Sequence, residues 1–288
     1  MRYLDAEATR RALPASDAIS AMEWAFSEVW EMPTRTSLGP ALVMPGMLDD
    51  VMAVKVVSVV PGNPAGVVVV FDADGSPIGV VDGHELTAIR TGAVTGLATR
   101  LLSSPGATKM AMLGAGAMAA DMIDSVRAVR PIERVIVWSR HHDNAARLAE
   151  TIGGEAVVSA DEAVAEAEII SCATPAHSPL FDGESVREGA HVNAVGAFRP
   201  EMVELPAGLL DRAYVVVDDV AAAAAEAGDL IQAGREPTTT LREVLAGAHP
   251  QIGEDVTVFK SVGIALQDVA AAHRALANAT ERDLGTIL

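Results

Sequence analysis

The stretch Lys109-Met110-Ala111-Met112-Leu113-Gly114-Ala115-Gly116-Ala117-Met118-Ala119, followed by Ala120-Asp121-Met122-Ile123, decides the fold. It reads as an apolar strand, a Gly-x-Gly-x-x-Ala turn and the start of a helix. Gly114 permits the tight turn, Gly116 lets the backbone approach a pyrophosphate, and Ala119 lets the helix pack against the strand. The first helical amides would then bind the anion. We therefore expect a dinucleotide to contact the loop residues Gly114, Ala115, Gly116, Ala117 and Met118.

Strand-like and helix-like segments alternate after this stretch. Strands are predicted at 109–113, 134–138, 155–158, 169–172, 191–194 and 214–217, and helices at 117–130 and 144–151. Alternation at this spacing indicates a parallel sheet with helices on both faces. We therefore predict an α/β fold with a Rossmann-type, doubly wound parallel sheet.

The first third of the chain has a different pattern. A helix is predicted from Ile19 to Trp30, and short β-like runs cover 51–60, 67–72 and 78–82. A helical stretch, 86–102, then meets the breaker Ser103-Ser104-Pro105-Gly106. These runs predict a smaller α+β domain with a mostly antiparallel sheet. The tail, 256–278, reads as a strand followed by a helix.

Composition excludes several classes of protein. The 288 residues carry a formal charge of −18, which argues against nucleic acid as a partner. No apolar run approaches the ~20 residues of a membrane span, and the start has no signal-peptide character. The single cysteine, Cys172, lies in an apolar run and fits a reducing cytoplasm. The seven histidines show no ligand spacing, so no metal site is predicted.

The end of the second strand bears on the choice of nicotinamide cofactor. NAD-binding units place an Asp or Glu there for the ribose 2′-hydroxyl. This chain has Ser139 and Arg140 instead, a hydroxyl and a guanidinium that suit a 2′-phosphate. We therefore expect NADPH, with NADH as the alternative cofactor.

Several segments together resemble the ornithine cyclodeaminase/mu-crystallin family. They are PTRTSLGP (residues 33–40), AVKVVSV (53–59), DGHELTAIRTGAVTGLAT (82–99), LGAGAMA (113–119), NAVGAFRPEMVEL (193–205) and VFKSVGIALQD (258–268). The resemblance implies a substrate-binding and dimerisation domain, 1–105, rejoined by the C-terminal helix, 262–288. It also implies an NAD(P)-binding domain, 106–261, and a homodimer built through the substrate-domain sheets.

The resemblance also implies site residues. The substrate carboxylate would be bound by Arg35, Lys55 and Arg90, a chemically sensible set because a carboxylate suits a bidentate guanidinium and a second cation. Lys55 interrupts an apolar β-run, although an outward-facing strand residue would explain it equally well. Further cofactor contacts are implied for residues beyond the glycine loop: Thr91, Thr174, Val195, Gly196 and Ser261.

The chain departs from the ornithine-cyclising members at Phe198. Those members carry a catalytic Asp at this position, two residues after the Gly of the NAVG segment, and a phenyl ring cannot accept a proton. Ketimine reductases of the family also lack the Asp. We therefore expect NADPH-dependent reduction of a cyclic imino acid, pyrroline-2-carboxylate or piperideine-2-carboxylate, to proline or pipecolate. Phe198 would contact the substrate ring, and Lys55, or water positioned by it, would supply the proton.

Rival functions remain open at this point. One is another amino-acid dehydrogenase of the family, alanine dehydrogenase or an opine-type enzyme, in which an amine enters the site. Ornithine cyclodeaminase follows, and a non-enzymatic binding protein is the remaining alternative.

Overall fold

The computed structural model describes residues 1–60, 65–248, 250 and 252–288, and divides into two compact units. The first unit comprises Met1–Val94 and Ile264–Leu288, and the second comprises Thr95–Gly263. The chain therefore leaves the first unit once and returns to it with its C-terminal segment.

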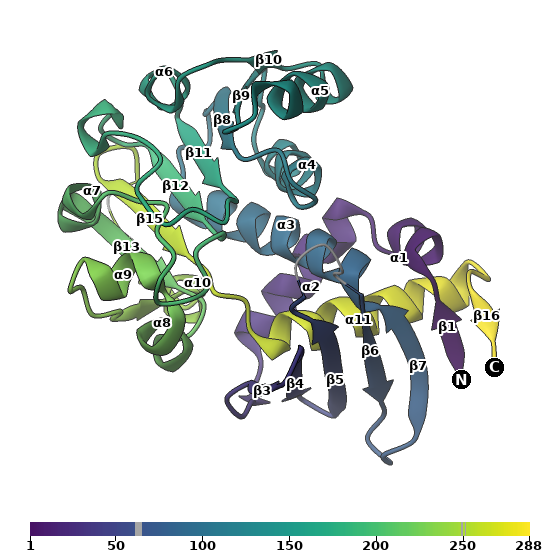
Figure 1. Ribbon diagram of the computed structural model, residues 1–288. Coiled ribbons are helices and arrows are strands. Elements are labelled where there is room, and N and C mark those ends of the chain that lie inside the picture. Colours follow the sequence, from purple (N-terminus) through teal and green to yellow (C-terminus); the bar gives the residue numbers. More distant parts are fainter. Residues whose placement is uncertain (61–64, 249, 251) are drawn as a thin grey trace. The chain divides into compact units, whose positions relative to one another are not determined.

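The second unit contains an eight-stranded sheet, and all pairs between its described strands are parallel. Figure 1 shows helices packed around this sheet. The strand order is β10-β9-β8-β11-β12-β15-β13-β14. Its elements in chain order are β8 (Lys109–Leu113), α4 (Ala119–Val129), β9 (Arg134–Trp138), α5 (His142–Ile152), β10 (Glu155–Ala156), α6 (Ala160–Ala165), β11 (Ile169–Cys172), the 3-10 helix η1 (Gly183–Ser185), β12 (His191–Ala194), α7 (Ala207–Arg212), β13 (Ala213–Val217), α8 (Val220–Glu226), α9 (Gly228–Gln232), β14 (Thr239–Thr240), α10 (Leu241–Leu245) and β15 (Val256–Lys260).

Both faces of this sheet are buried. Successive residues of a strand point to opposite faces, and in β8 Met110 and Met112 belong to one hydrophobic cluster while Ala111 and Leu113 belong to another. The first cluster includes side chains of α4 and α5, and the second includes side chains of α6 and α7. The doubly wound sheet predicted from the alternating pattern is confirmed.

The first unit holds a sheet with the order β16-β1-β7-β6-β5-β4-β2, and β3 also pairs with β4. Only β1 and β7 pair in parallel among its described strands, which confirms the mostly antiparallel sheet. Its elements are β1 (Arg2–Leu4), α1 (Ala6–Ala12), α2 (Ala15–Ser27), β2 (Trp30–Glu31), β3 (Thr36–Leu38), β4 (Ala41–Leu48), β5 (Val51–Ser58), β6 (Gly66–Phe71), β7 (Pro77–Asp82), α11 (Ala265–Glu281) and β16 (Thr286–Ile287).

Helix α11 packs on one face of this sheet, across β4, β5, β6 and β7 (Figure 1). The alternation along β5 shows which face. Ala53 and Lys55 are buried on the side of α11, whereas Met52 and Val56 are exposed. Lys55 therefore points inward, and the alternative that it is an outward-facing strand residue is wrong.

The division between the units differs from the boundary expected at residue 105. It falls after Val94, inside the long helix α3 (Gly83–Leu102). The last turns of α3 are bonded within the second unit, because the buried Arg130 donates to the carbonyl oxygens of Thr99, Arg100 and Ser103. The Pro-Gly breaker ends the helix but does not end the unit. The roles assigned to the two domains stay predictions.

Two elements of the first unit also differ from the prediction. The helix expected to reach Trp30 ends at Ser27, because Trp30 belongs to β2 and pairs there with Leu48 of β4. Strand β4 was not predicted, since Pro45 and Gly46 lie within it and both residues usually mark loops.

No helix in the described part of the chain is both long and apolar enough to cross a membrane.

A buried histidine connects the middle strands of the parallel sheet to α3. His191 Nδ1 lies 2.8 Å from Thr257 Oγ1, and Nε2 lies 3.0 Å from Asn193 Oδ1. Thr257 Oγ1 also donates to the carbonyl oxygen of Leu102 at 2.9 Å. Burial lowers the pKa of His191 to about 3, so the folded protein keeps this side chain neutral.

This lowered pKa predicts acid sensitivity. Below the ordinary pKa of about 6.5 the unfolded chain binds a proton that the folded chain does not, until the pH approaches 3. As the pH is lowered through this window, the free energy of unfolding should decrease, by up to ~1.4 kcal/mol per pH unit from this group. In urea titrations between pH 6 and 4, His191→Gln should lose stability less steeply than the wild type, and the exposed His142→Gln should match the wild type. Equal slopes for wild type and His191→Gln would contradict the assignment.

Candidate functional site

The glycine loop between β8 and α4 has the geometry of an anion site. Gly114 has a φ of +113°, and a Cβ on it would lie 2.5 Å from the carbonyl oxygen of Ala173, so only glycine fits there. Space around Gly116 is open. Helix α4 begins at Ala119 without a side-chain cap, so no capping side chain competes with an anion at this helix start, although the Ala119 amide itself donates to the Gly116 carbonyl oxygen at 3.1 Å. The loop fits the pyrophosphate of a dinucleotide.

A cavity of about 520 Å³ opens beside this loop. It is lined by residues from the carboxyl ends of β8, β9 and β11. Six predicted cofactor contacts lie in its wall: Gly114, Ala115, Gly116, Ser139, Arg140 and Thr174. Of the other loop residues, Ala117 and Met118 follow directly in the chain and lie outside this wall. The cavity is where the structure brings half of the twelve predicted cofactor contacts together.

Charge in this cavity favours an anionic ligand. Arg140 is exposed at the end of β9, and His141 and Asn144 lie beside it in the wall. No Asp or Glu is among the described residues that line the cavity. A carboxylate that would repel a 2′-phosphate is therefore missing from this wall, as the sequence predicted for the end of β9.

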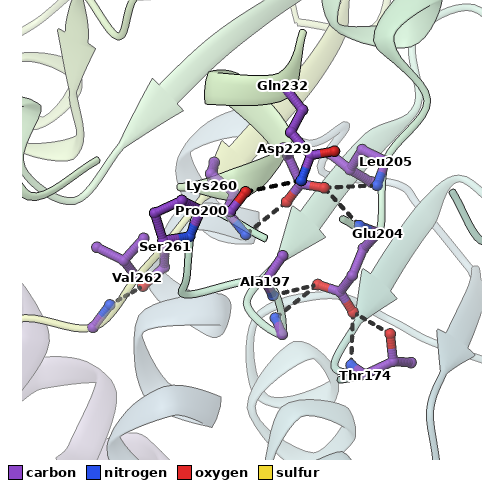
Figure 2. A network of polar contacts seen from close by, with 12 residues as sticks. Thr174, Ala197, Pro200, Glu204, Leu205, Asp229, Gln232, Lys260, Ser261 and Val262 are labelled. Atoms are coloured by element: carbon purple, nitrogen blue, oxygen red, sulfur yellow. Dashed lines mark hydrogen bonds and ion pairs between the residues drawn. The ribbon is translucent and has the colours of Figure 1, made fainter. Parts of the chain in front are cut away.

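The turns that follow β11 and β12 are joined by a buried carboxylate (Figure 2). Glu204 accepts hydrogen bonds from Thr174 in the first turn and from the amides of Gly196 and Ala197 in the second. The predicted contacts Val195 and Gly196 are themselves buried. Ser261 is also buried and donates to Asp218 at 2.8 Å.

A second polar site is buried inside the first unit. Lys55 Nζ lies 2.7 Å from Asp268 Oδ2, and Arg90 Nε donates to Asp268 Oδ1 at 3.2 Å. Arg90 Nη1 donates to Gln267 Oε1 at 2.5 Å. Strand β5 positions Lys55, α3 positions Arg90, and the first turn of α11 positions Asp268. Asp268 thus holds two cations that are 35 residues apart in the sequence.

The electrostatics of this cluster adjust the acidity of Lys55. Burial is the main cause that lowers its pKa, to about 8, with contributions from the charges of Arg90 and Arg35, while Asp268 raises it. Arg35, directly before β3, is therefore near enough to act on Lys55. Near neutral pH the ammonium group keeps its proton but releases it more readily than an ordinary lysine. The three cations predicted from the sequence are brought together, and Lys55 can donate a proton.

Thr91, Phe198 and Cys172 are all at least partly buried. Thr91 is buried in α3, next to Arg90 in the chain. Phe198 is half-buried in the second unit, packs against its hydrophobic core, and has the Arg199 guanidinium 5.5 Å from its ring centroid. Cys172 is buried in β11, and burial raises the pKa of its thiol well above the usual range, so the thiol is not an activated nucleophile.

Sequence reasoning missed the acidic partners of both sites. Asp268, which follows the neutral Gln267, lies in a helical run that is otherwise largely apolar, and Glu204 lies between Val203 and Leu205. Charges inside apolar runs are the signal that could have found them, because buried charges need partners. Among the described residues, no group of three His, Cys, Asp or Glu side chains could hold a metal ion.

Comparisons with known proteins find similarity over most of the chain. The sequence profile of the ornithine cyclodeaminase/mu-crystallin family matches residues 18–283. The chain is 40% identical over 215 residues to ketimine reductase mu-crystallin from Mus musculus, covering 74% of this chain and 69% of the relative. It is 37% identical over 285 residues to a Delta(1)-pyrroline-2-carboxylate reductase from Bacillus cereus, covering 88% of this chain and 87% of the relative.

A solved structure is similar over the whole chain. Delta(1)-pyrroline-2-carboxylate reductase from Thermococcus litoralis, in complex with NADH and L-proline, superposes with a TM-score of 0.94 at 29% identity, covering all of both chains. Its ligands are a nicotinamide cofactor and a cyclic amino acid.

Proposed function

The chain belongs to the ornithine cyclodeaminase/mu-crystallin family, and we propose that it reduces a cyclic imino acid with NADPH. The substrate class is pyrroline-2-carboxylate or piperideine-2-carboxylate, and the products are proline or pipecolate. The observation that carries the proposal is the buried cluster of Lys55 and Arg90 around Asp268. Its chemistry suits a small substrate that has a carboxylate next to a basic nitrogen.

The charge of the cluster fits one substrate carboxylate. Lys55, Arg90 and Arg35 supply three positive charges against the single negative charge of Asp268. Arg90 uses Nε and Nη1 inside the protein, which leaves Nη2 for a ligand. Gln267 Nε2 is buried and has no hydrogen-bond acceptor among the described residues, so an incoming oxygen would satisfy it.

Lys55 is the proton donor in this proposal. NADPH, when bound in the second unit, supplies the hydride for the imine carbon. Reduction of a C=N bond needs one hydride at carbon and one proton at nitrogen, and the C=N double bond becomes a CH–NH single bond. Lys55 supplies the proton from Nζ directly or through a water, and Asp268 keeps Lys55 protonated until the substrate is present.

NADPH is the proposed cofactor because Ser139 and Arg140 stand where a ribose-binding acid would be. Both line the cavity beside the glycine loop, and its described wall carries no carboxylate. A guanidinium pairs with a 2′-phosphate and stacks on adenine. NADH stays the alternative, and it is the cofactor bound to the Thermococcus litoralis relative.

Phe198 supports imine reduction over ornithine cyclisation. The cyclising members of the family carry a carboxylate at this position, and the half-buried Phe198 has no group that takes up a proton. Contact between Phe198 and the substrate ring stays a prediction, as do the cofactor contacts of Thr91, Thr174, Val195, Gly196 and Ser261.

A homodimer built through the first unit's sheet is also proposed. The face of the sheet opposite α11 carries apolar side chains that are exposed: Met47, Met52, Val56 and Val67 are each between 37% and 42% exposed. Val56 pairs with Val67 and Met52 pairs with Met47, so the four side chains lie as two cross-strand pairs in an apolar strip on this face. An apolar strip of this kind favours a second copy as its cover. The cytoplasmic location stays a prediction.

The function is tested with purified protein. It should oxidise NADPH with pyrroline-2-carboxylate or piperideine-2-carboxylate and release no ammonia from ornithine in the presence of NAD. Arg90→Met should lower kcat/KM for the imine by about 30-fold or more, because a charge-assisted contact to the carboxylate is lost. Arg10→Met, which removes a surface partner of Glu85 in the same unit, should leave kcat/KM unchanged.

Other outcomes would redirect the function. Turnover of keto acids only in the presence of ammonia would show an amino-acid dehydrogenase. Conversion of ornithine to proline would show a cyclodeaminase. Absence of turnover with every substrate would leave a binding protein.

Cofactor choice is tested at Arg140. Arg140→Asp should raise the KM for NADPH by about tenfold or more and change the KM for NADH much less, because the lost partner is the 2′-phosphate. Arg147→Asp makes the same change of charge on neighbouring α5 and should affect both cofactors weakly. If Arg140→Asp raised both KM values equally, Arg140 would not discriminate between the cofactors.

A further inference from the structure

Glu204 is a buried carboxylate that spans two turns of the second unit (Figure 2). Its Oε1 accepts from the Thr174 amide at 2.6 Å and from Thr174 Oγ1 at 2.9 Å. Its Oε2 accepts from the amides of Gly196 at 2.7 Å and Ala197 at 3.2 Å. The two turns follow neighbouring strands, β11 and β12, so one side chain ties two strand ends together.

These four contacts require the ionised form of Glu204. All four partners donate, and a carboxylic acid or an amide would turn a proton toward one pair of donors. Burial raises the pKa of Glu204 above its ordinary value and the charge of Asp229 adds to the rise, while Lys260 and the hydrogen bonds from Thr174 oppose it. The four donors and Lys260 thus favour the charged form against the cost of burial.

A buried ion pair between Asp229 and Lys260 holds the backbone of Glu204 in place. Asp229 Oδ1 accepts from the Glu204 amide at 2.6 Å and from the Leu205 amide at 2.9 Å. Asp229 Oδ2 lies 2.8 Å from Lys260 Nζ, and neither side chain is exposed to solvent. Lys260 is the last residue of β15, the strand next to β12. The chain of contacts thus runs from β15 through Asp229 and Glu204 to the ends of β12 and β11.

The two turns are also in direct contact, which makes their spacing sensitive. A Cβ on Gly196 would lie 2.2 Å from the Thr174 carbonyl oxygen. Thr174 lines the cofactor cavity, and Phe198 follows two residues after Gly196. A change in the position of either turn would therefore move the cavity wall and the residue that distinguishes this chain from the cyclising members.

We propose that Glu204 is a positioning residue for the nicotinamide half of the cofactor, acting through the Thr174 and Gly196–Ala197 turns. The inference rests on the proposed function in one respect, that the nicotinamide ring lies against these turns. The adenosine half binds at the glycine loop and at Ser139 and Arg140, which Glu204 does not contact. Loss of Glu204 should therefore affect the two halves of the cofactor differently.

The test compares a whole cofactor with a half cofactor. In Glu204→Gln, the amide group opposes one pair of donors and releases one turn. Titration calorimetry should show NADPH binding about tenfold weaker, whereas adenosine 2′,5′-bisphosphate should bind as it does to the wild type. In single-turnover experiments, hydride transfer should slow by about 100-fold, as expected for a misplaced reactant. If the wild type prefers NADH, then NADH and ADP replace these two ligands.

Glu168→Gln provides a matched control. Glu168 precedes β11 at the opposite end of the strand and accepts from the amides of Thr108 and Lys109 at 2.9 and 3.1 Å. The Glu168→Gln variant should be less stable than the wild type, but its affinities for NADPH and for adenosine 2′,5′-bisphosphate should not change relative to each other. If Glu204→Gln does not fold, Glu204→Asp keeps the charge but cannot span both turns, and it should show the same difference between ligands.

The binding measurements need no imine, so they stand even if the enzyme reduces another substrate. Equal weakening of both ligands, or unchanged NADPH binding in a folded variant, would overturn the proposal.

Discussion

The ion pair between Asp268 and the cations Lys55 and Arg90 is the constraint around which the first unit is built. All three side chains are almost completely buried, and removing one partner of such a pair leaves an uncompensated charge that costs about 3–5 kcal/mol. Residues from α3, β5 and the start of α11 must therefore meet at one place. The returning helix contributes Asp268, so the cluster is complete only when the segment after the parallel sheet packs on the first unit.

The local charge of the two candidate sites differs in sign from the net charge of the chain. The chain as a whole carries a charge of −18, yet Lys55, Arg90 and Arg35 exceed the single carboxylate among them, and the described cavity wall at the glycine loop has no acid. Each of the two candidate sites thus has a local surplus of positive charge that suits an anion. The second unit uses buried acids in a different way, because Glu204 and Asp229 bind backbone amides and so fix turns.

Much of the fold follows from local patterns in the sequence. The strands 109–113, 134–138, 169–172 and 191–194 have the predicted bounds, because strands buried on both faces are rich in apolar residues and are bounded by turn signals. Strand β4 escaped prediction because Pro45 and Gly46 are loop formers in isolation, and only pairing with β5 makes them strand residues. The Pro-Gly breaker likewise marks the end of α3 but not the division of units, which depends on contacts of Thr99 and Arg100 with the distant Arg130. The cations of the Lys55 and Arg90 cluster were predicted through resemblance, whereas Asp268 and Glu204 were not, since their partners are distant in sequence and no local pattern indicates them.

The dependence of kcat/KM on pH tests the central claim most directly, that Asp268 holds Lys55 as the proton donor for an imine. In the wild type, kcat/KM for the cyclic imine should fall as the pH rises through the pKa of Lys55, about 8, because the deprotonated amine has no proton to donate. Asp268→Asn removes the charge that raises this pKa, so the alkaline fall should move to lower pH. Titration of the imine itself is the same for both proteins and cannot produce the difference. An alkaline fall at the same pH in the folded variant and the wild type would contradict the claim.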